Sequence, residues 1–210
     1  FVSAASLRKG NLADLGLARR LEPVQRCRKV GKRDMVLRVV AQLRPREDVP
    51  DLWLLAAPVK KVRLDMVVEK ACELGVALYQ PVITRRTIVE RLNMDRLRAT
   101  MVEAAEQCGR TALPRIEEAV KLPALLRDWP ADRTLYFADE EGGVPFAEVA
   151  KPGPAAILIG PEGGFSAEER TKLRALPFVT PISLGPRILR ADTAAVAALT
   201  LWQTTLGDWL

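Results

Sequence analysis

An uninterrupted apolar run at residues 155–159, Ala-Ala-Ile-Leu-Ile, constrains the fold of this chain most strongly. A run without polar alternation is typical of a parallel strand that is covered by helices on both faces. A glycine-rich turn follows it, and then Ser166-Ala167-Glu168-Glu169, whose Ser-x-x-Glu spacing predicts the start of a helix. We therefore expect strand, turn and helix in succession around residue 160.

The same alternation extends over most of the chain. Apolar or β-branched runs predict strands at residues 52–57, 77–83, 134–138 and 179–184. Helical periodicity predicts a helix before Gly75, a longer helix ending near Gly109, and a last helix at about residues 193–206. This order predicts an α/β domain with a mostly parallel sheet and helices on both sides.

The N-terminal quarter has a different pattern. Residues 35–40 read as a strand, whereas residues 1–33 show weak periodicity, and a turn-rich segment with Pro45 and Pro50 separates this region from the strand at 52–57. We therefore expect two domains, a small, partly β domain at 1–51 and an α/β domain at 52–210. Because the chain begins at Phe1 without a methionine, we also expect the first domain to be incomplete.

The positive charge of the chain is concentrated in the same N-terminal region. The net charge is +6, and residues 1–60 carry 13 Lys and Arg against 6 Asp and Glu, whereas residues 61–210 carry 19 against 20. Such an excess suits attraction to a phosphate backbone, although a solvated basic face is the plain alternative. The candidate RNA-binding residues here are Arg26, Arg28, Lys29 and Arg33.

Composition excludes several classes of enzyme. The chain has no histidine, and its three cysteines, Cys27, Cys72 and Cys108, form neither a CxxC metal site nor a disulfide framework. Zinc hydrolases, zinc deaminases and Ser-His-Asp hydrolases are therefore improbable, and we expect no metal. No apolar run approaches the roughly 20 residues that a membrane helix needs, so we expect a cytoplasmic protein without a membrane partner.

Two glycine-proline loops are the candidate ligand site. Each follows an expected strand and precedes an expected helix: IGPEGGF at residues 159–165 and SLGPRILRADT at residues 183–193. Ligands of open α/β sheets bind beyond the carboxyl ends of the strands, and neither loop has the spacing of a Walker or dinucleotide motif. Ile188 and Leu189 could form an apolar wall for a flat ligand or pack as core residues under the loop, and Arg190 could be solvated or face a reacting anion.

Four segments closely resemble the RsmE family, the 16S ribosomal RNA uridine N3-methyltransferases. They are the two loops, KACELGV at residues 70–76, and AAEQCGR at residues 104–110 followed by Pro114. The resemblance covers about residues 52–210 and implies a SPOUT fold with a C-terminal trefoil knot, a homodimer, and a PUA-like RNA-binding N-terminal domain. It also implies S-adenosyl-L-methionine (SAM) as cofactor, bound by Leu158, Gly160, Pro161, Glu162, Gly163, Gly164, Leu184, Gly185, Ile188, Leu189 and Thr193.

The expected activity is transfer of a methyl group from SAM to N3 of a uridine in 16S rRNA of the small ribosomal subunit. Arg190 is the candidate catalytic residue that stabilises the charge of the deprotonated base, and Arg110 is a further candidate for RNA contact. Glu162 could serve as general base or cap the backbone, and Asp192 stands where the family commonly has glutamate. The alternatives are a SPOUT enzyme acting on tRNA or another rRNA position, and a non-catalytic RNA-binding assembly factor.

Overall fold

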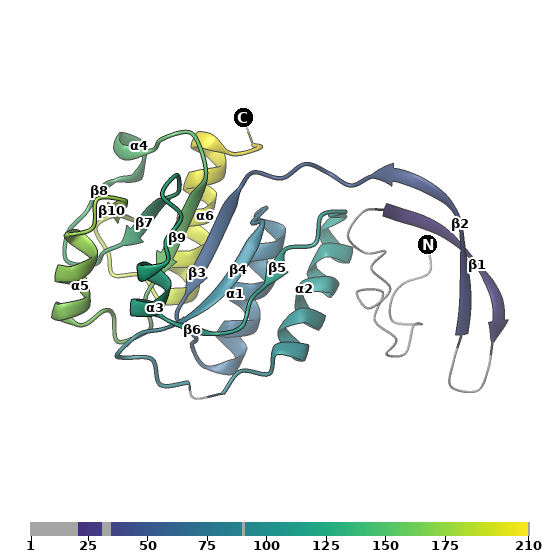
Figure 1. The fold of residues 1–210 in the computed structure, drawn as a ribbon, viewed down its shortest axis with the longest axis horizontal. Coiled ribbons are helices and arrows are strands. Elements are labelled where there is room, and N and C mark those ends of the chain that lie inside the picture. The colour runs from purple at the N-terminus through teal and green to yellow at the C-terminus, as the bar shows by residue number, and fades with distance from the viewer. Residues whose placement is uncertain (1–20, 31–34, 90, 210) are drawn as a thin grey trace.

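The computed structural model describes residues 21–30, 35–89 and 91–209, with side chains described from residue 41 onward. Two strands, β1 (Leu21–Val30) and β2 (Met35–Pro45), pair antiparallel in a sheet of their own. Figure 1 shows this ribbon at one end of the molecule, apart from the other strands and the helices. Strand β2 was predicted, but β1 was not, because its arginines, lysine and proline hide any alternation of apolar and polar residues.

The rest of the chain forms an α/β domain around a parallel sheet, as the alternation predicted. The central strands are β3 (Leu52–Ala56), β4 (Leu78–Ile83), β7 (Thr134–Ala138), β9 (Ala155–Ile159) and β10 (Val179–Ser183). The short strands β5 (Arg115–Ile116), β6 (Val120–Lys121) and β8 (Val144–Pro145) extend it. The strand order is β5-β4-β3-β9-β7-β10-β8, with β6 also paired to β4 and every pair parallel.

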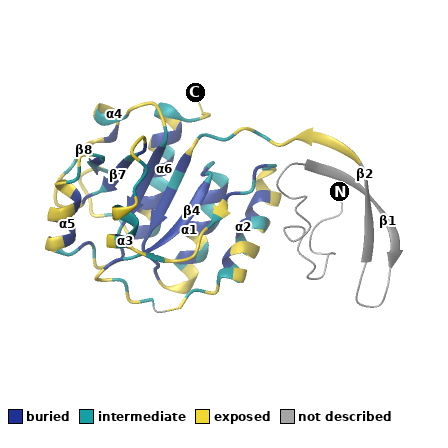
Figure 2. Cartoon of the chain, viewed as in Figure 1, coloured by how far each residue is buried: buried dark blue, intermediate teal, exposed yellow. Residues whose placement is uncertain are grey.

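Helices cover both faces of this sheet (Figure 1). Residues of α1 (Lys61–Glu73), α2 (Met94–Cys108), α4 (Phe146–Val149) and α6 (Ala191–Leu206) belong to one apolar cluster with Leu54 and Ile157. Residues of α3 (Leu122–Arg127) and α5 (Ala167–Arg174) belong to a second cluster with Leu55 and Leu158. Adjacent strand residues thus point to opposite clusters, and all five residues of β9 are buried, which explains its uninterrupted apolar sequence (Figure 2).

The predicted helix boundaries are close to those observed. The left-handed Gly109, with φ 77°, ends α2, and Ser166 and Glu169 form the predicted capping box at the start of α5. The last helix begins at Ala191, two residues before the predicted start. No helix within the described part of the chain combines the length and apolar character required to cross a membrane.

The two described cysteines differ in environment. Cys72 is buried on α1, and this burial raises the pKa of its thiol to about 12, whereas Cys108 is exposed at the end of α2. Since the thiolate is the reactive form of cysteine, a raised pKa and burial both protect Cys72 from alkylation.

We expect iodoacetamide to label Cys108 readily in the folded protein and Cys72 on the order of a thousandfold more slowly. Mass spectrometry of peptides sampled over time measures both rates separately. In urea both thiols should react alike, which controls for local sequence. Equal rates in the folded protein would contradict the buried position of Cys72.

Candidate active site

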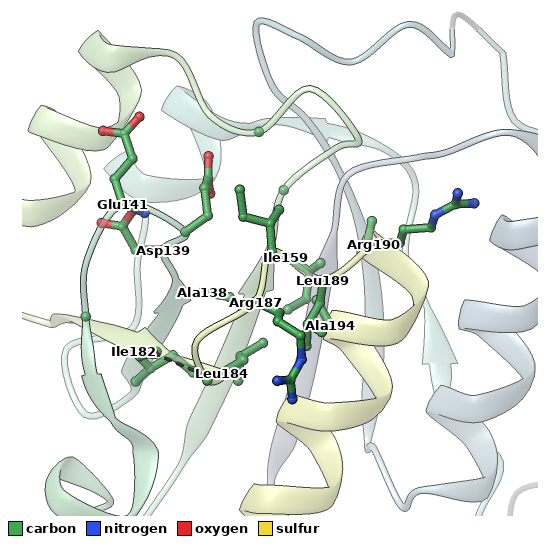
Figure 3. A pocket seen from close by; sticks show the side chains of 18 of the residues that line it. Ala138, Asp139, Glu141, Ile159, Ile182, Leu184, Arg187, Leu189, Arg190 and Ala194 are labelled. Atoms are coloured by element: carbon green, nitrogen blue, oxygen red, sulfur yellow. Dashed lines mark hydrogen bonds between the residues drawn. The ribbon is translucent and has the colours of Figure 1, made fainter.

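A cavity of about 900 Å³ lies at the carboxyl ends of β7, β9 and β10. The segment after each of these neighbouring strands contributes to its wall: residues 139–143 after β7, residues 160–164 after β9, and residues 184–190 after β10. Figure 3 shows these segments converging around Ile159, with the first turn of α6 beside them. The sheet edge at which the sequence predicted a ligand site is therefore hollow.

The first glycine-proline loop is a tight turn between β9 and α5. The Gly164 amide donates to the Pro161 carbonyl oxygen at 2.9 Å, and Gly164 has a left-handed φ of 68°. A side chain at this position would meet the carboxylate of Glu140, so both conformation and space favour glycine. Arg86 also donates to the Gly163 carbonyl oxygen at 2.7 Å. The turn hydrogen bond and Arg86 thus hold the loop in the shape that lines the cavity.

The second loop presents apolar groups to the cavity. Gly185 has a φ of 108° and turns the chain out of β10, while Ile188 is 84% exposed and lines the cavity. Leu184 and Leu189 are half-buried and pack against the core cluster beneath. The two alternatives for Ile188 and Leu189, a wall for a ligand and packing under the loop, therefore each apply to one residue. Leu189 packs against the core, and Ile188 forms an exposed wall of the cavity.

An acidic segment after β7 forms the third wall. Asp139 is fully buried, and Glu140 and Glu141 follow it, with side chains 30% and 65% exposed. The buried guanidinium of Arg170 on α5 contacts a carboxylate oxygen of each, at 3.0, 2.6 and 2.6 Å respectively. Arg174, one turn later, donates to Asp139 at 2.6 Å. These ion pairs fix the acidic segment against α5, with its carboxylates along the cavity.

The sequence did not single out this acidic wall. The signal was present, since residues 139–143 read Asp-Glu-Glu-Gly-Gly directly after an expected strand. Arg63 was also missed: it lines the cavity from α1 and pairs with Glu162 at 3.0 Å. Glu162 is thus an ion-pair partner, and no hydrogen bond within the described residues gives it a backbone-capping role.

Most predicted cofactor residues lie together at the cavity. The residues that line it are Gly160, Pro161, Glu162, Gly163, Gly164, Leu184, Gly185, Ile188 and Leu189, together with the predicted catalytic Arg190. The other two do not line it: Leu158 is fully buried in the second core cluster, and Thr193 is exposed on the first turn of α6. Arg190 is exposed at the start of α6 and points away from Asp139 and Glu141 (Figure 3).

The predicted RNA-binding residues lie away from this cavity. Arg26, Arg28 and Lys29 belong to β1, and their side chains, like the whole of Arg33, lie outside the described residues. Arg110 is described, with a side chain only 8% exposed. It donates to the carbonyl oxygens of Cys72 and Val76, at 2.6 and 3.2 Å, and pairs with Glu47 at 3.2 Å. This environment favours a structural role for Arg110 over the predicted RNA contact.

No group of three His, Cys, Asp or Glu side chains in the described ranges could hold a metal ion. The acidic residues of the cavity are matched instead by arginines, Arg170 and Arg174 on α5 and Arg63 on α1. Their carboxylates are therefore held as acceptors and negative charges of the wall.

Replacing Arg170 by Met should destabilise the fold by about 2–4 kcal/mol, because it leaves a buried carboxylate that only Arg174 still pairs. Urea unfolding followed by circular dichroism measures this change. The matched control is Arg127→Met, because Arg127 forms an exposed pair with Asp128 that should contribute less than about 1 kcal/mol. Equal stabilities of the two variants would refute the structural importance of the buried network.

The sequence and fold of this chain are similar to those of known RNA methyltransferases. Residues 46–203 match the RNA methyltransferase domain family. The ribosomal RNA small subunit methyltransferase E of Rickettsia conorii is 30% identical over 175 residues, which cover 81% of this chain and 71% of that protein. The parallel sheet also matches the fold of SPOUT-type enzymes.

Two solved structures are similar over most of the chain. A methyltransferase of Legionella pneumophila in complex with SAM is 33% identical, with a TM-score of 0.80, covering 88% of this chain and 78% of its own. A ribosomal RNA small subunit methyltransferase E of Neisseria gonorrhoeae bound to SAM is 25% identical, with a TM-score of 0.84, covering 92% and 83%. This chain belongs to the RNA methyltransferase family, and within it to the ribosomal RNA small subunit methyltransferase E group.

Proposed function

We propose that this protein transfers a methyl group from SAM to N3 of a uridine in 16S rRNA of the small ribosomal subunit, in the cytoplasm. The observation that carries the proposal is the cavity formed after β7, β9 and β10, in a chain similar to small-subunit rRNA methyltransferases, one of which is bound to SAM. An open α/β sheet binds its ligand at this edge.

The residues of the cavity fit SAM in size, polarity and charge. A volume of about 900 Å³ is within the range of small-molecule sites. Ile188, together with the half-buried Leu184 and Leu189, offers an apolar surface for a purine ring. The carboxylates of Glu140 and Glu141 suit a cofactor that carries positive charge on its sulfur and its amino group.

SAM supplies a methyl group that is already activated by the positive sulfur, so no covalent bond to the enzyme is needed. The task of this chain is to hold the cofactor in one orientation and to align the base with it. The first glycine-proline loop is held for this by its own turn and by Arg86, and the acidic segment is held by Arg170.

Arg190 is the proposed catalytic residue. The N3 proton of uracil must pass to solvent water or to a base before N3 accepts the methyl group, and the resulting negative charge spreads onto the neighbouring carbonyl oxygens. Arg190 is exposed at the cavity and no described residue pairs with it, so its guanidinium is free to face that charge. Because N3 belongs to the Watson–Crick edge, the base must be unpaired when it reacts.

The proposal extends to the architecture around the site. We assign residues 1–51 to a PUA-like RNA-binding domain and 52–210 to a SPOUT domain with a C-terminal trefoil knot. In the sheet, β7 lies between β9 and β10, which both follow it in the sequence. The connection from β9 to β10 therefore crosses over β7, and such a crossing is compatible with a knotted chain. The separate β1–β2 sheet and the basic N-terminal sequence support the first assignment.

We also propose that the protein is a homodimer. Large apolar side chains are exposed on the packed pair of helices α1 and α6: Val62 and Met66 on the first and Leu201 on the second. Burial of such groups favours association.

Sedimentation equilibrium should give twice the chain mass for the wild type. The double variant Val62→Asp/Met66→Asp should shift the protein toward monomer, because it places charges on the exposed apolar surface. A monomeric wild type would contradict the assignment.

The experiment that tests the function is methyl transfer from labelled SAM to small ribosomal subunits that lack the modification. We expect label in 3-methyluridine after digestion and chromatography. Arg190→Ala should lower kcat by about a hundredfold or more with SAM affinity unchanged, since it removes stabilisation of the reacting anion. Arg190→Lys, which keeps a cation, should lose less.

Each other outcome has a definite meaning. Full activity of Arg190→Ala would refute the role of that residue. Label in another nucleoside, or in tRNA alone, would keep the cofactor site and replace the substrate. SAM binding without transfer to any RNA would favour a non-catalytic assembly factor.

A further inference from the structure

A second hollow lies beside the proposed cofactor cavity. It has a volume of about 330 Å³ and is formed where β3 leads into α1 and where the chain enters α2. Its lining combines apolar and polar residues: Val59, Leu64, Val89 and Leu92 on one hand, and Lys61, Arg91, Arg96 and Asn93 on the other. Among the residues that the structure describes, the lining contains three cations and no carboxylate.

Two of the three cations have no partner within the described residues. Arg96 pairs with Asp65 at 3.0 Å, but Lys61 and Arg91 are exposed and form no ion pair or hydrogen bond with any described side chain. Lys60, next to Lys61, is exposed and equally unpaired. Within the described residues, the positive charge of Lys61 and Arg91 at the hollow is therefore not neutralised by an ion pair.

Helix stability does not explain these lysines. Lys60 is the N-cap of α1 and gives no side-chain cap, Lys61 is its first residue, and the first turn has no acidic residue. Positive side chains at the positive end of a helix dipole are unfavourable. An anion in the adjoining hollow would remove this penalty.

Neighbouring residues on the first turn of α1 line the hollow and the cofactor cavity. Arg63 on the first turn of α1 lines the cavity and pairs with Glu162 at 3.0 Å, and Lys61 lies two residues earlier on that turn. Both sites also lie at the carboxyl edge of the sheet, since α1 follows β3 and the glycine-proline loop follows β9, its neighbour. A polymer whose base enters the cavity would have its backbone close to this turn.

We propose that the hollow binds a backbone phosphate of the RNA substrate close to the nucleotide that is methylated, through Lys61 and Arg91. This inference rests on the proposed function and adds an RNA contact in the α/β domain to those of the N-terminal region. Lysine and arginine contacts to phosphate position a nucleic acid without reading its sequence.

The test compares the wild-type chain with Lys61→Ala/Arg91→Ala on small ribosomal subunits. We expect the KM for the subunit to rise about tenfold or more, with kcat at saturating subunit and SAM affinity unchanged. In direct binding, the slope of log Kd against log salt should fall by about 0.7–0.9 for each phosphate that the variant no longer neutralises. Lys61→Arg should retain wild-type affinity, because it keeps the charge.

Arg115→Ala/Lys151→Ala is the matched control. It removes the same charge from exposed positions near the amino ends of the strands, away from the hollow. Arg115 pairs with the first residue of β4, and Lys151 lies in the segment before β9. We expect this variant to bind like the wild type. Equal losses in both double variants would show a general charge effect and overturn the phosphate site.

Two further results would also overturn the proposal. One is unchanged subunit affinity and salt dependence in Lys61→Ala/Arg91→Ala. The other is binding of free uridine monophosphate that depends on these two residues while subunit binding does not, which would assign the hollow to a free nucleotide. Failure of the wild type to methylate any RNA would refute the proposed function, whereas the binding comparison would still test the hollow.

Discussion

The parallel pairing of β9, β7 and β10 is the constraint on which the site depends. Because these strands are neighbours and run in one direction, the three segments that leave them emerge side by side at one edge of the sheet. The buried apolar sequence of β9 fixes that strand in the centre, with helices on both faces. Segments more than forty residues apart in sequence therefore line one cavity.

Helix α5 links this sheet edge to the shape of the cavity. Its N-terminal capping box anchors the first glycine-proline loop, and its Arg170 and Arg174 hold the acidic segment after β7. Glu169 also accepts a hydrogen bond from the Arg85 amide at 2.7 Å, which ties the segment after β4 to the same helix. Several walls of the site are thus held by one short helix, so the cavity is shaped before any ligand binds.

The sheet and the two loops could be predicted from the sequence because the features that specify them involve residues close together in the chain. The apolar run of β9, the capping box at Ser166 and the glycine at position 109 each act within a few residues. The acidic wall was harder to predict, because Arg170 contacts residues about thirty positions earlier and only the fold brings them together. For the same reason the contacts of Arg110 with the carbonyl oxygens of Cys72 and Val76 could not be read from its sequence neighbours, and its RNA contact stays a prediction.

A crystal structure of the protein grown with SAM tests the central claim most directly. The account predicts the cofactor between residues 160–164 and 184–189, with its charged groups toward Glu140 and Glu141 and its methyl group accessible from the side of Arg190. Cofactor bound elsewhere, for example in the hollow beside α1, would contradict the assignment of the cavity and the chemistry built on it.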